Sequence, residues 1–307
     1  MTNSFFRRPD DPAADAGYED PPARKGFFTD TSVCIGCKAC EVACKEWNDV
    51  PAGGFDLLGM SFDNTGMLGA DSWRHVAFIE QSGHSIEQSG RAPVETPPVD
   101  IGMPSFERPG DKTGAETRQD FRWLMSSDVC KHCTHAGCLD VCPTGALFRT
   151  EFGTVVVQPD ICNGCGYCVS ACPYGVIDRR EGDGRAWKCT LCYDRLRDGM
   201  EPACAKACPT DSIQFGDLDE LRARAAERLD VLHADGVAEA RLYGEKPDDG
   251  VGGDGAFFLL LDEPEVYGLP PDPHVPTRDA GRMWKAAGLA GLSLVAGAVG
   301  SFLGGRR

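Results

Sequence analysis

Sixteen cysteines constrain this chain more than any other feature, because they stand in four compact groups of four. Two groups have the spacing C-x2-C-x2-C-x3-C, and the last three groups each end in Cys-Pro. In proteins with two [4Fe–4S] clusters, three cysteines of such a run bind one cluster and the fourth binds its neighbour. Sixteen thiolates at four per cluster therefore predict four [4Fe–4S] clusters, with no cysteine left over. The groups are Cys34-Cys37-Cys40-Cys44, Cys130-Cys133-Cys138-Cys142, Cys162-Cys165-Cys168-Cys172 and Cys189-Cys192-Cys204-Cys208.

Local geometry explains why this spacing suits a cluster. A tight Cys-x2-Cys-x2-Cys loop curls around one cubane, so three thiolates reach three irons and backbone amides can point at the sulfurs. Gly36, Gly164 and Gly166 lie inside these loops and suit a backbone that closely approaches a bulky group. The fourth cysteine lies about one helical turn further on, so it faces elsewhere and can serve a second cluster.

Two other uses of cysteine fit the pattern less well. A disulfide framework is typical of short secreted chains, whereas this chain has 307 residues and we expect no cleavable signal peptide at its start. Zinc ribbons use two CxxC pairs far apart, not four cysteines within eleven residues. Because exposed thiolates and clusters need reducing conditions for assembly, we expect loading in the cytoplasm.

Composition limits the function further. A formal net charge of −16 argues against nucleic-acid binding and favours partners with basic docking faces. The sequence contains no credible acid–base or nucleophile set, so we predict a non-catalytic, electron-transferring part of an oxidoreductase. His132 and His135 lie inside the second cysteine group, where one of them could tune or cap a cluster. The preferred interpretation is that both are surface or supporting residues without redox chemistry.

The order of the groups predicts a nested arrangement. Groups two and three are close together, and between them Phe148–Arg149 and Thr154–Val157 flank a turn at Gly153 and are typical of a short hairpin. Together they make one complete two-cluster ferredoxin unit. Groups one and four then lack sequence neighbours, and the economical arrangement pairs them with each other. The fold class predicted is α+β, with two nested bacterial-ferredoxin-like modules, long loops and a C-terminal helix.

Five regions follow from this arrangement. In the outer module, Trp73–Glu80 is a plausible strand, but the rest of the stretch between groups one and two has no assigned fold. After group four, Asp217 and Glu220 have capping-box spacing and open an amphipathic helix that ends at Gly236. The Gly-rich loop DGVGGDG, which lacks the context of a nucleotide site, precedes a strand AFFLLLD. The regions are a disordered or extended arm (1–26), the outer module (27–129 and 179–216), the inner module (130–178), a helix and strand extension (217–280) and an anchor helix (281–307).

The C-terminal segment is the one membrane-like stretch. Residues Ala286 to Leu303 are uncharged and about long enough to span a bilayer. Many of them are Gly or Ala, which weakens the hydrophobicity but suits close packing against another membrane helix. We predict a transmembrane anchor, with a soluble C-terminal helix as the alternative. Basic residues on both sides leave the orientation undecided by charge.

Beyond the cysteine spacing, the chain contains the segments TDTSVCIGCKACEVACKEWN, FDLLGMSFDNTG, SWRHVAFIEQ, KHCTHAGCLDVCPTGAL, CNGCGYCVSACPYGV, KCTLCYDRLRDGMEPACAKACPTDSIQFG, DLDELRARAAERL and YGLPPDP. These segments resemble one family, the iron–sulfur (beta) subunit of membrane-bound, molybdenum- or tungsten-dependent formate dehydrogenases. The resemblance covers most of the chain, from about Phe27 to the C-terminus. The cysteine groups alone are shared with beta subunits of nitrate, dimethyl sulfoxide and polysulfide reductases and with some hydrogenases, whereas the insert and the C-terminal helix favour formate dehydrogenase.

The resemblance implies a role and partners. A catalytic alpha subunit with a bis-pterin Mo or W centre oxidises formate, and this subunit relays the electrons to a membrane cytochrome b (gamma) subunit that reduces quinone. The expected location is the cytoplasmic membrane, with the cluster domains on the extracytoplasmic side, exported with the alpha subunit's signal. The alternatives are an electron-transfer subunit of another molybdopterin reductase or hydrogenase, and a soluble polyferredoxin carrier.

The resemblance also implies how the cysteines are shared. Every ligand position is Cys, so four cubanes are expected and no three-iron cluster. The implied sets are Cys34, Cys37, Cys40 and Cys208 for the first cluster; Cys189, Cys192, Cys204 and Cys44 for its neighbour; Cys130, Cys133, Cys138 and Cys172 for the third; and Cys162, Cys165, Cys168 and Cys142 for the fourth.

Four lysines are candidates for tuning the cluster potentials. Lys38, Lys131 and Lys206 lie between cysteines of one group, and Lys188 directly precedes Cys189. Reduction adds negative charge to a cluster, so a nearby ammonium that is shielded from water raises its potential. The alternative for any one lysine is a screened surface charge that helps docking. Lys188 is the strongest candidate, for the cluster of Cys189, because the neighbouring Trp187 could exclude water.

Overall fold

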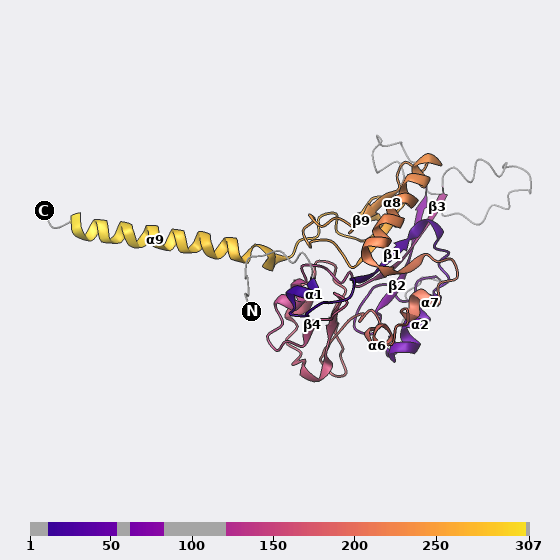
Figure 1. Ribbon diagram of the computed structural model, residues 1–307, viewed down its shortest axis with the longest axis horizontal. Coiled ribbons are helices and arrows are strands. Elements are labelled where there is room, and N and C mark those ends of the chain that lie inside the picture. The colour runs from indigo at the N-terminus through magenta and orange to yellow at the C-terminus, as the bar shows by residue number, and fades with distance from the viewer. Residues whose placement is uncertain (1–11, 54–61, 83–120, 305–307) are drawn as a thin grey trace, which may run out of the picture.

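The computed structural model describes residues 12–53, 62–82 and 121–304, which form a body of short helices and strands with one long helix projecting from it (Figure 1). Part of the predicted arm (1–11), parts of the insert (54–61 and 83–120) and the last three residues lie outside the described residues. Residues 12–24 differ from the expected disordered or extended arm. Helix α1 (Pro12–Asp15) has a buried Ala13, and the Tyr18 hydroxyl donates to the Arg149 carbonyl at 3.2 Å.

A four-stranded mixed sheet with the order β8-β1-β10-β9 forms the centre of the body. Strand β1 (Lys25–Asp30) runs antiparallel to β8 (Ile213–Asp217) and parallel to β10 (Ala256–Leu260), which pairs with β9 (Arg241–Tyr243). All five residues of β10 are buried, as the apolar run AFFLLLD predicts for a central strand. The predicted boundary at 216/217 therefore cuts through one sheet, because strands of the extension pair with the start of the outer module.

The predicted amphipathic helix is confirmed as α8 (Leu218–Ala234), whose apolar face covers the sheet. The helix stops before Gly236, which has φ 88°. The capping box, however, is wrong. Asp217 occupies the N-cap position without a side-chain capping bond, and its carboxylate instead pairs with Lys25 on the neighbouring strand β1. Lys25 and Asp217 face each other in the β1–β8 register, so sheet pairing overrides the local cap.

The insert contributes a two-stranded ribbon beside the first cysteine group. The predicted strand at Trp73–Glu80 is confirmed as β2 (Arg74–Ser82), and β3 (Phe121–Val129), which the sequence did not predict, pairs with it antiparallel along nine residues. Strand β2 contacts helix α2 (Ala39–Asn48), which carries two cysteines of group one. The ribbon therefore covers the first cysteine group from one side.

The inner module is built from very short elements. Its predicted hairpin is confirmed as β4 (Leu147–Arg149) and β5 (Val155–Val157), with Gly153 at φ 74° in the turn.

The remaining short elements of the described chain are η1 (Thr31–Val33), α4 (Gly137–Asp140), η2 (Pro159–Ile161), α5 (Tyr167–Ala171), β6 (Asp178–Arg179), β7 (Ala186–Trp187), α6 (Tyr193–Arg197), α7 (Ala203–Lys206), η3 (Pro264–Tyr267) and η4 (Pro276–Asp279).

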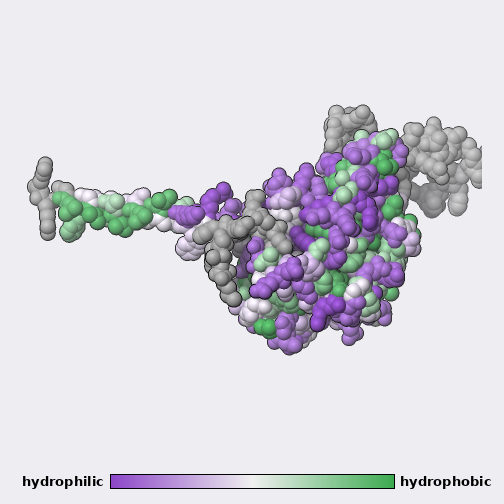
Figure 2. Space-filling model, in the orientation of Figure 1, coloured by the Kyte–Doolittle hydropathy of each residue, from purple (hydrophilic) through white to green (hydrophobic). Residues whose placement is uncertain are grey.

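Helix α9 (Ala280–Gly304) is the projecting helix, and residues Gly281–Leu303 are long and apolar enough to cross a membrane. None of that stretch is buried against the body. Figure 2 shows apolar surface along most of the helix, in contrast to the mixed surface of the body. The helix leaves the body beside α4, where the Thr277 hydroxyl donates to Asp140 at 2.5 Å. These features are consistent with membrane anchoring.

Candidate metal centres

The sixteen cysteines gather into four tetrads, each made of three cysteines from one group and the last cysteine of another. Three tetrads line cavities, which we call sites I, III and IV. The fourth tetrad, site II, lies in the same buried cluster as part of site I. Their members coincide with the ligand sets that the resemblance implies, although the ligand assignment itself stays a prediction. The tetrads are site I (Cys34, Cys37, Cys40, Cys208), site II (Cys44, Cys189, Cys192, Cys204), site III (Cys130, Cys133, Cys138, Cys172) and site IV (Cys142, Cys162, Cys165, Cys168).

Site II unites cysteines that are far apart in the sequence. The Asn48 amide on α2 lies 3.7 Å from the Cys44 Sγ and 3.8 Å from the Cys192 Sγ. Burial first, and then the adjacent Cys189 and Cys204 thiols, raise the pKa of Cys44 well above its usual range. Such crowding of buried thiols suits a strongly positive polynuclear metal group, whose binding would release their protons.

Short helices place adjacent cysteines at adjacent sites. Cys40 and Cys44 lie one turn apart on α2, and one faces site I while the other faces site II. Cys168 lies on α5 at site IV, and Cys172 follows that helix and lies at site III. The fourth cysteines of groups two and four likewise lie at a different site from the cysteine one helical turn before them. Each of these short helices therefore links two sites.

Tight loops hold the thiols at sites I and IV. Gly36 has φ 65°, and a Cβ there would lie 2.7 Å from the Phe78 ring. Gly164 has φ 71°, and a Cβ there would lie 2.5 Å from the Gly184 carbonyl oxygen. Both positions therefore require glycine, and both allow the cysteine loop to curl as the sequence predicted.

Backbone amides point at several thiols, as a cluster site requires. The amide of Leu191 donates to the Cys189 Sγ at 3.3 Å, and that of Ala186 donates to the Cys162 Sγ at 3.4 Å. Burial alone would raise the pKa of Cys142, but the amides of residues 144, 146 and 147 outweigh it and lower the pKa. At Cys142 these amides thus favour the thiolate, the form that binds iron.

His132 lies at site III and not on the surface, so of the two predicted positions the structure favours the supporting one. Its side chain is 2 % exposed and lines the cavity of site III. The Nδ1 atom accepts from the Val155 amide at 3.1 Å, which places the ring proton of the neutral imidazole on Nε2. Burial, followed by the nearby Lys188, lowers the pKa of His132 and keeps it neutral. Within the described chain Nε2 has no hydrogen-bond partner. Its N–H is therefore a donor available to a group bound at site III.

The Gly-rich loop, to which the sequence assigned no role, docks on the second cysteine group. The amides of Thr134 and His135 donate to carbonyls of Gly253 and Val251 at 3.0 and 2.7 Å. Gly252 has φ 78° and lies against the His135 ring, where a Cβ would come within 2.4 Å. The loop therefore packs on the segment that carries the cysteines of site III, and it needs its glycines for close approach.

Two of the four candidate lysines are buried near thiols. The Lys188 side chain is buried (the residue is 1 % exposed), donates to the Val155 and Cys189 carbonyls, and lines the cavity of site III. Burial tends to lower its pKa, but Cys130 and Cys138 outweigh that effect and raise it. Its ammonium therefore faces site III. It also neighbours Cys189 of site II, the cluster for which the sequence made Lys188 the strongest candidate. Lys131 is equally buried but forms an ion pair with Asp128.

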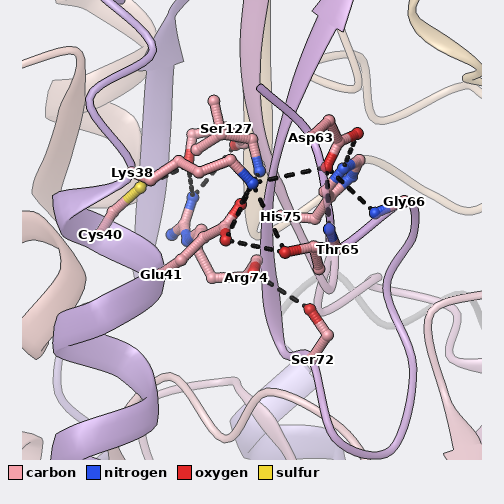
Figure 3. Close-up of polar contacts among 11 residues, drawn as sticks. Lys38, Cys40, Glu41, Asp63, Thr65, Gly66, Ser72, Arg74, His75 and Ser127 are labelled. Carbon is pink, nitrogen blue, oxygen red and sulfur yellow. Dashed lines mark hydrogen bonds and ion pairs between the residues drawn. The ribbon is translucent and has the colours of Figure 1, made fainter. Parts of the chain in front are cut away.

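The other two lysines are compensated or exposed. Lys38 forms ion pairs with Glu41 at 3.1 Å and Asp63 at 3.4 Å, in a network that joins α2 to the insert (Figure 3). The Lys206 side chain is 71 % exposed and pairs with Glu201 at 3.2 Å. Lys206 therefore matches the alternative of a screened surface charge.

Sequence reasoning missed Arg74, the first residue of β2. Its guanidinium is buried, and Nη2 lies 3.3 Å from the Cys204 Sγ of site II. The only signal in the sequence is a basic residue at the start of a predicted strand, which does not distinguish it from a surface arginine.

The four sites form a row in the order I–II–III–IV. Sites I and II share helix α2, and sites III and IV share the segment around α5. Sites II and III are linked by Cys189, whose pKa is raised to about 12 by burial and then by Cys130. Of the sixteen cysteines, only Cys37 at site I and Cys165 at site IV are exposed. The most exposed cysteines therefore lie at the two ends of the row, and all four cysteines of site II are buried.

Comparisons with known proteins find [4Fe–4S] domains over the segments that hold the cysteine groups. Two family models, each described as a 4Fe-4S dicluster domain, match residues 33–146 and 121–218. The chain is 38 % identical to the iron–sulfur subunit of nitrate-inducible formate dehydrogenase of Escherichia coli over 272 residues, covering 87 % of this chain and 79 % of the relative. It is 38 % identical to the formate dehydrogenase iron–sulfur subunit of Haemophilus influenzae, covering 80 % and 68 %. The B subunit of the anaerobic dimethyl sulfoxide reductase of E. coli is 34 % identical, covering 64 % and 75 %.

Proposed function

This chain belongs to the family of formate dehydrogenase iron–sulfur subunits, and on that premise we propose that it relays electrons through four [4Fe–4S] clusters held at sites I to IV. Its role is electron transfer within a molybdopterin oxidoreductase complex. The clusters, when bound, take up and pass on single electrons. The polypeptide holds them by the four tetrads, keeps water from the middle of the row and adjusts their charge environment.

The observation that carries this proposal is the row of tetrads with exposed ends at Cys37 and Cys165. An electron carrier needs one place to receive electrons and another to deliver them. Site IV lies in the inner module, near which α9 leaves the body through the contact of Thr277 with Asp140. This supports delivery at site IV to a membrane cytochrome b, and reception at site I from the catalytic molybdopterin subunit.

Both ends also carry exposed apolar side chains suited to protein partners. Ile35 and Val42 are exposed near Cys37, and Ile161 and Tyr167 are exposed near Cys165. We propose that α9 anchors the chain in the cytoplasmic membrane, with the cluster-bearing body on the extracytoplasmic side. The similarity to the dimethyl sulfoxide reductase subunit keeps a second candidate, the same role in another molybdopterin enzyme. Identifying the large subunit that copurifies with this protein would distinguish the two.

Iron content tests the number of clusters. Anaerobically purified protein is expected to contain about sixteen irons and sixteen sulfides per chain, because each tetrad would hold one cubane. Iron and acid-labile sulfide analysis, with EPR of the reduced protein, measures this directly. Tightly bound zinc, or a strong three-iron signal in intact protein, would contradict four cubanes.

Replacing Lys188 with methionine tests charge tuning. The change is expected to lower the reduction potential of the site III cluster by roughly tens of millivolts, because a buried ammonium beside Cys130 and Cys138 stabilises the reduced form. Lys206→Met is the control and is expected to shift nothing, because its charge is exposed and paired. An EPR-monitored redox titration compares the variants. Unchanged site III potential with normal cluster content would remove Lys188 from the tuning residues.

A further inference from the structure

Arg74 lies between two cluster sites and touches both, one directly and one through a serine. Its Nη2 lies 3.3 Å from the Sγ of Cys204 at site II. Its Nη1 donates to the carbonyl and hydroxyl oxygens of Ser127, at 3.1 and 3.3 Å. The Ser127 hydroxyl in turn lies 3.2 Å from the Sγ of Cys40 at site I (Figure 3). A single guanidinium on β2 therefore reaches thiols of sites I and II.

This guanidinium is buried without a carboxylate partner in the described part of the chain. Arg74 is 2 % exposed, lies 4.9 Å from the centre of the Phe27 ring and leaves its Nε without a hydrogen bond. Lys38 and Lys131, by contrast, are each paired with acidic side chains. Burying an uncompensated cation is costly, so a nearby anion is expected.

When a cluster is bound, the cysteines of the two sites are thiolates, and these are the nearby anions. An arginine guanidinium is protonated at any pH at which proteins stay folded. The guanidinium therefore stays charged whatever the redox state of its surroundings. Its planar guanidinium directs separate N–H groups at two partners in a fixed geometry.

We propose that Arg74 is a counter-cation shared by the clusters at sites I and II. It raises both potentials and so offsets the repulsion between the reduced clusters. The inference rests on the proposed electron-transfer function. Each reduction adds one electron and so one negative charge to a cluster, and no bond is made or broken. A fixed positive charge between two such centres stabilises either reduced form, and in a buried environment its effect is larger than in water.

Two variants of the full chain, purified with its native partners, test the proposal. Arg74→Gln removes the charge but keeps an amide that can hydrogen bond, and Arg74→Lys keeps the charge. In an anaerobic titration with dithionite followed by EPR, Arg74→Gln is expected to lower the potentials of two of the four clusters. A tenfold fall in the ratio of reduced to oxidised cluster at fixed ambient potential, equal to about 59 mV for one electron, is the expected scale. Arg74→Lys is expected to recover most of that shift, and the control Lys206→Met to cause none.

The outcomes separate the inference from the function on which it rests. Four clusters at unshifted potentials in Arg74→Gln would overturn the role of Arg74 and leave electron transfer intact, whereas fewer than four clusters in unaltered protein would contradict the proposed function. Loss of two clusters in Arg74→Gln that Arg74→Lys restores would support the counter-cation. Equal loss in both variants would make Arg74 a structural residue and overturn it.

Discussion

Replacing Cys44 with alanine is expected to remove the cluster at site II and to leave the cluster at site I largely intact. Cys44 follows the other cysteines of group one in the sequence, but it lies with Cys189, Cys192 and Cys204 in the structure. About four of the sixteen irons should be lost, together with the EPR signal of one cluster. Iron analysis and EPR of the reduced variant measure both quantities.

Cys40→Ala is the matched control, because Cys40 lies one helical turn before Cys44 but lines site I. The two variants are expected to lose different EPR signals. If Cys44→Ala instead lost only the cluster of Cys34, the exchange of fourth cysteines between the outer groups would be refuted.

Deleting residues 286–307 is expected to move the protein from the membrane to the soluble fraction with all four clusters in place. Residues 281–303 bury no surface in the body, so their loss removes no contact that holds the sites. Formate oxidation with an artificial dye should survive in the truncated complex, while quinone reduction should be lost. Fractionation, iron analysis and the two activity assays distinguish these effects.

A point variant gives an independent check on the anchor. Leu294→Arg places a charge near the middle of α9, where insertion into a bilayer would cost about 3 kcal/mol. Weaker membrane association is therefore expected without loss of iron. A truncated protein that stayed with membranes and still reduced quinone would disprove the anchor.

The features that could be predicted from the sequence depend on short-range patterns. The apolar run of β10 and the periodic leucines of α8 each carry a local preference that the sheet and its covering helix satisfy. The turn at Gly153 likewise forms where a residue with positive φ is required. Strand β3 was missed because a nine-residue partner for β2 is defined by a long-range pairing across the insert.

The environments of the functional side chains also depend on long-range contacts that short-range patterns do not show. Lys206 and Lys188 stand equally near cysteines in the sequence, yet one is exposed and the other is buried at site III. No short-range sequence pattern predicts that His132 and Arg74 are buried, because their neighbours come from β5 and α7, far away in the chain. Their roles follow from contacts that no spacing rule describes.

By itself, the sequence determined that the chain holds [4Fe–4S] clusters, that its cysteines form four groups and that its last helix is apolar, since metal-ligand spacing and apolar length are local properties. The tertiary structure decided the order of the sites along the row, the two ends that reach solvent and the cations buried beside the thiols. It decided them because burial and charge compensation depend on which distant segments pack together, and a carboxylate partner exists for Lys131 but not, within the described residues, for Arg74.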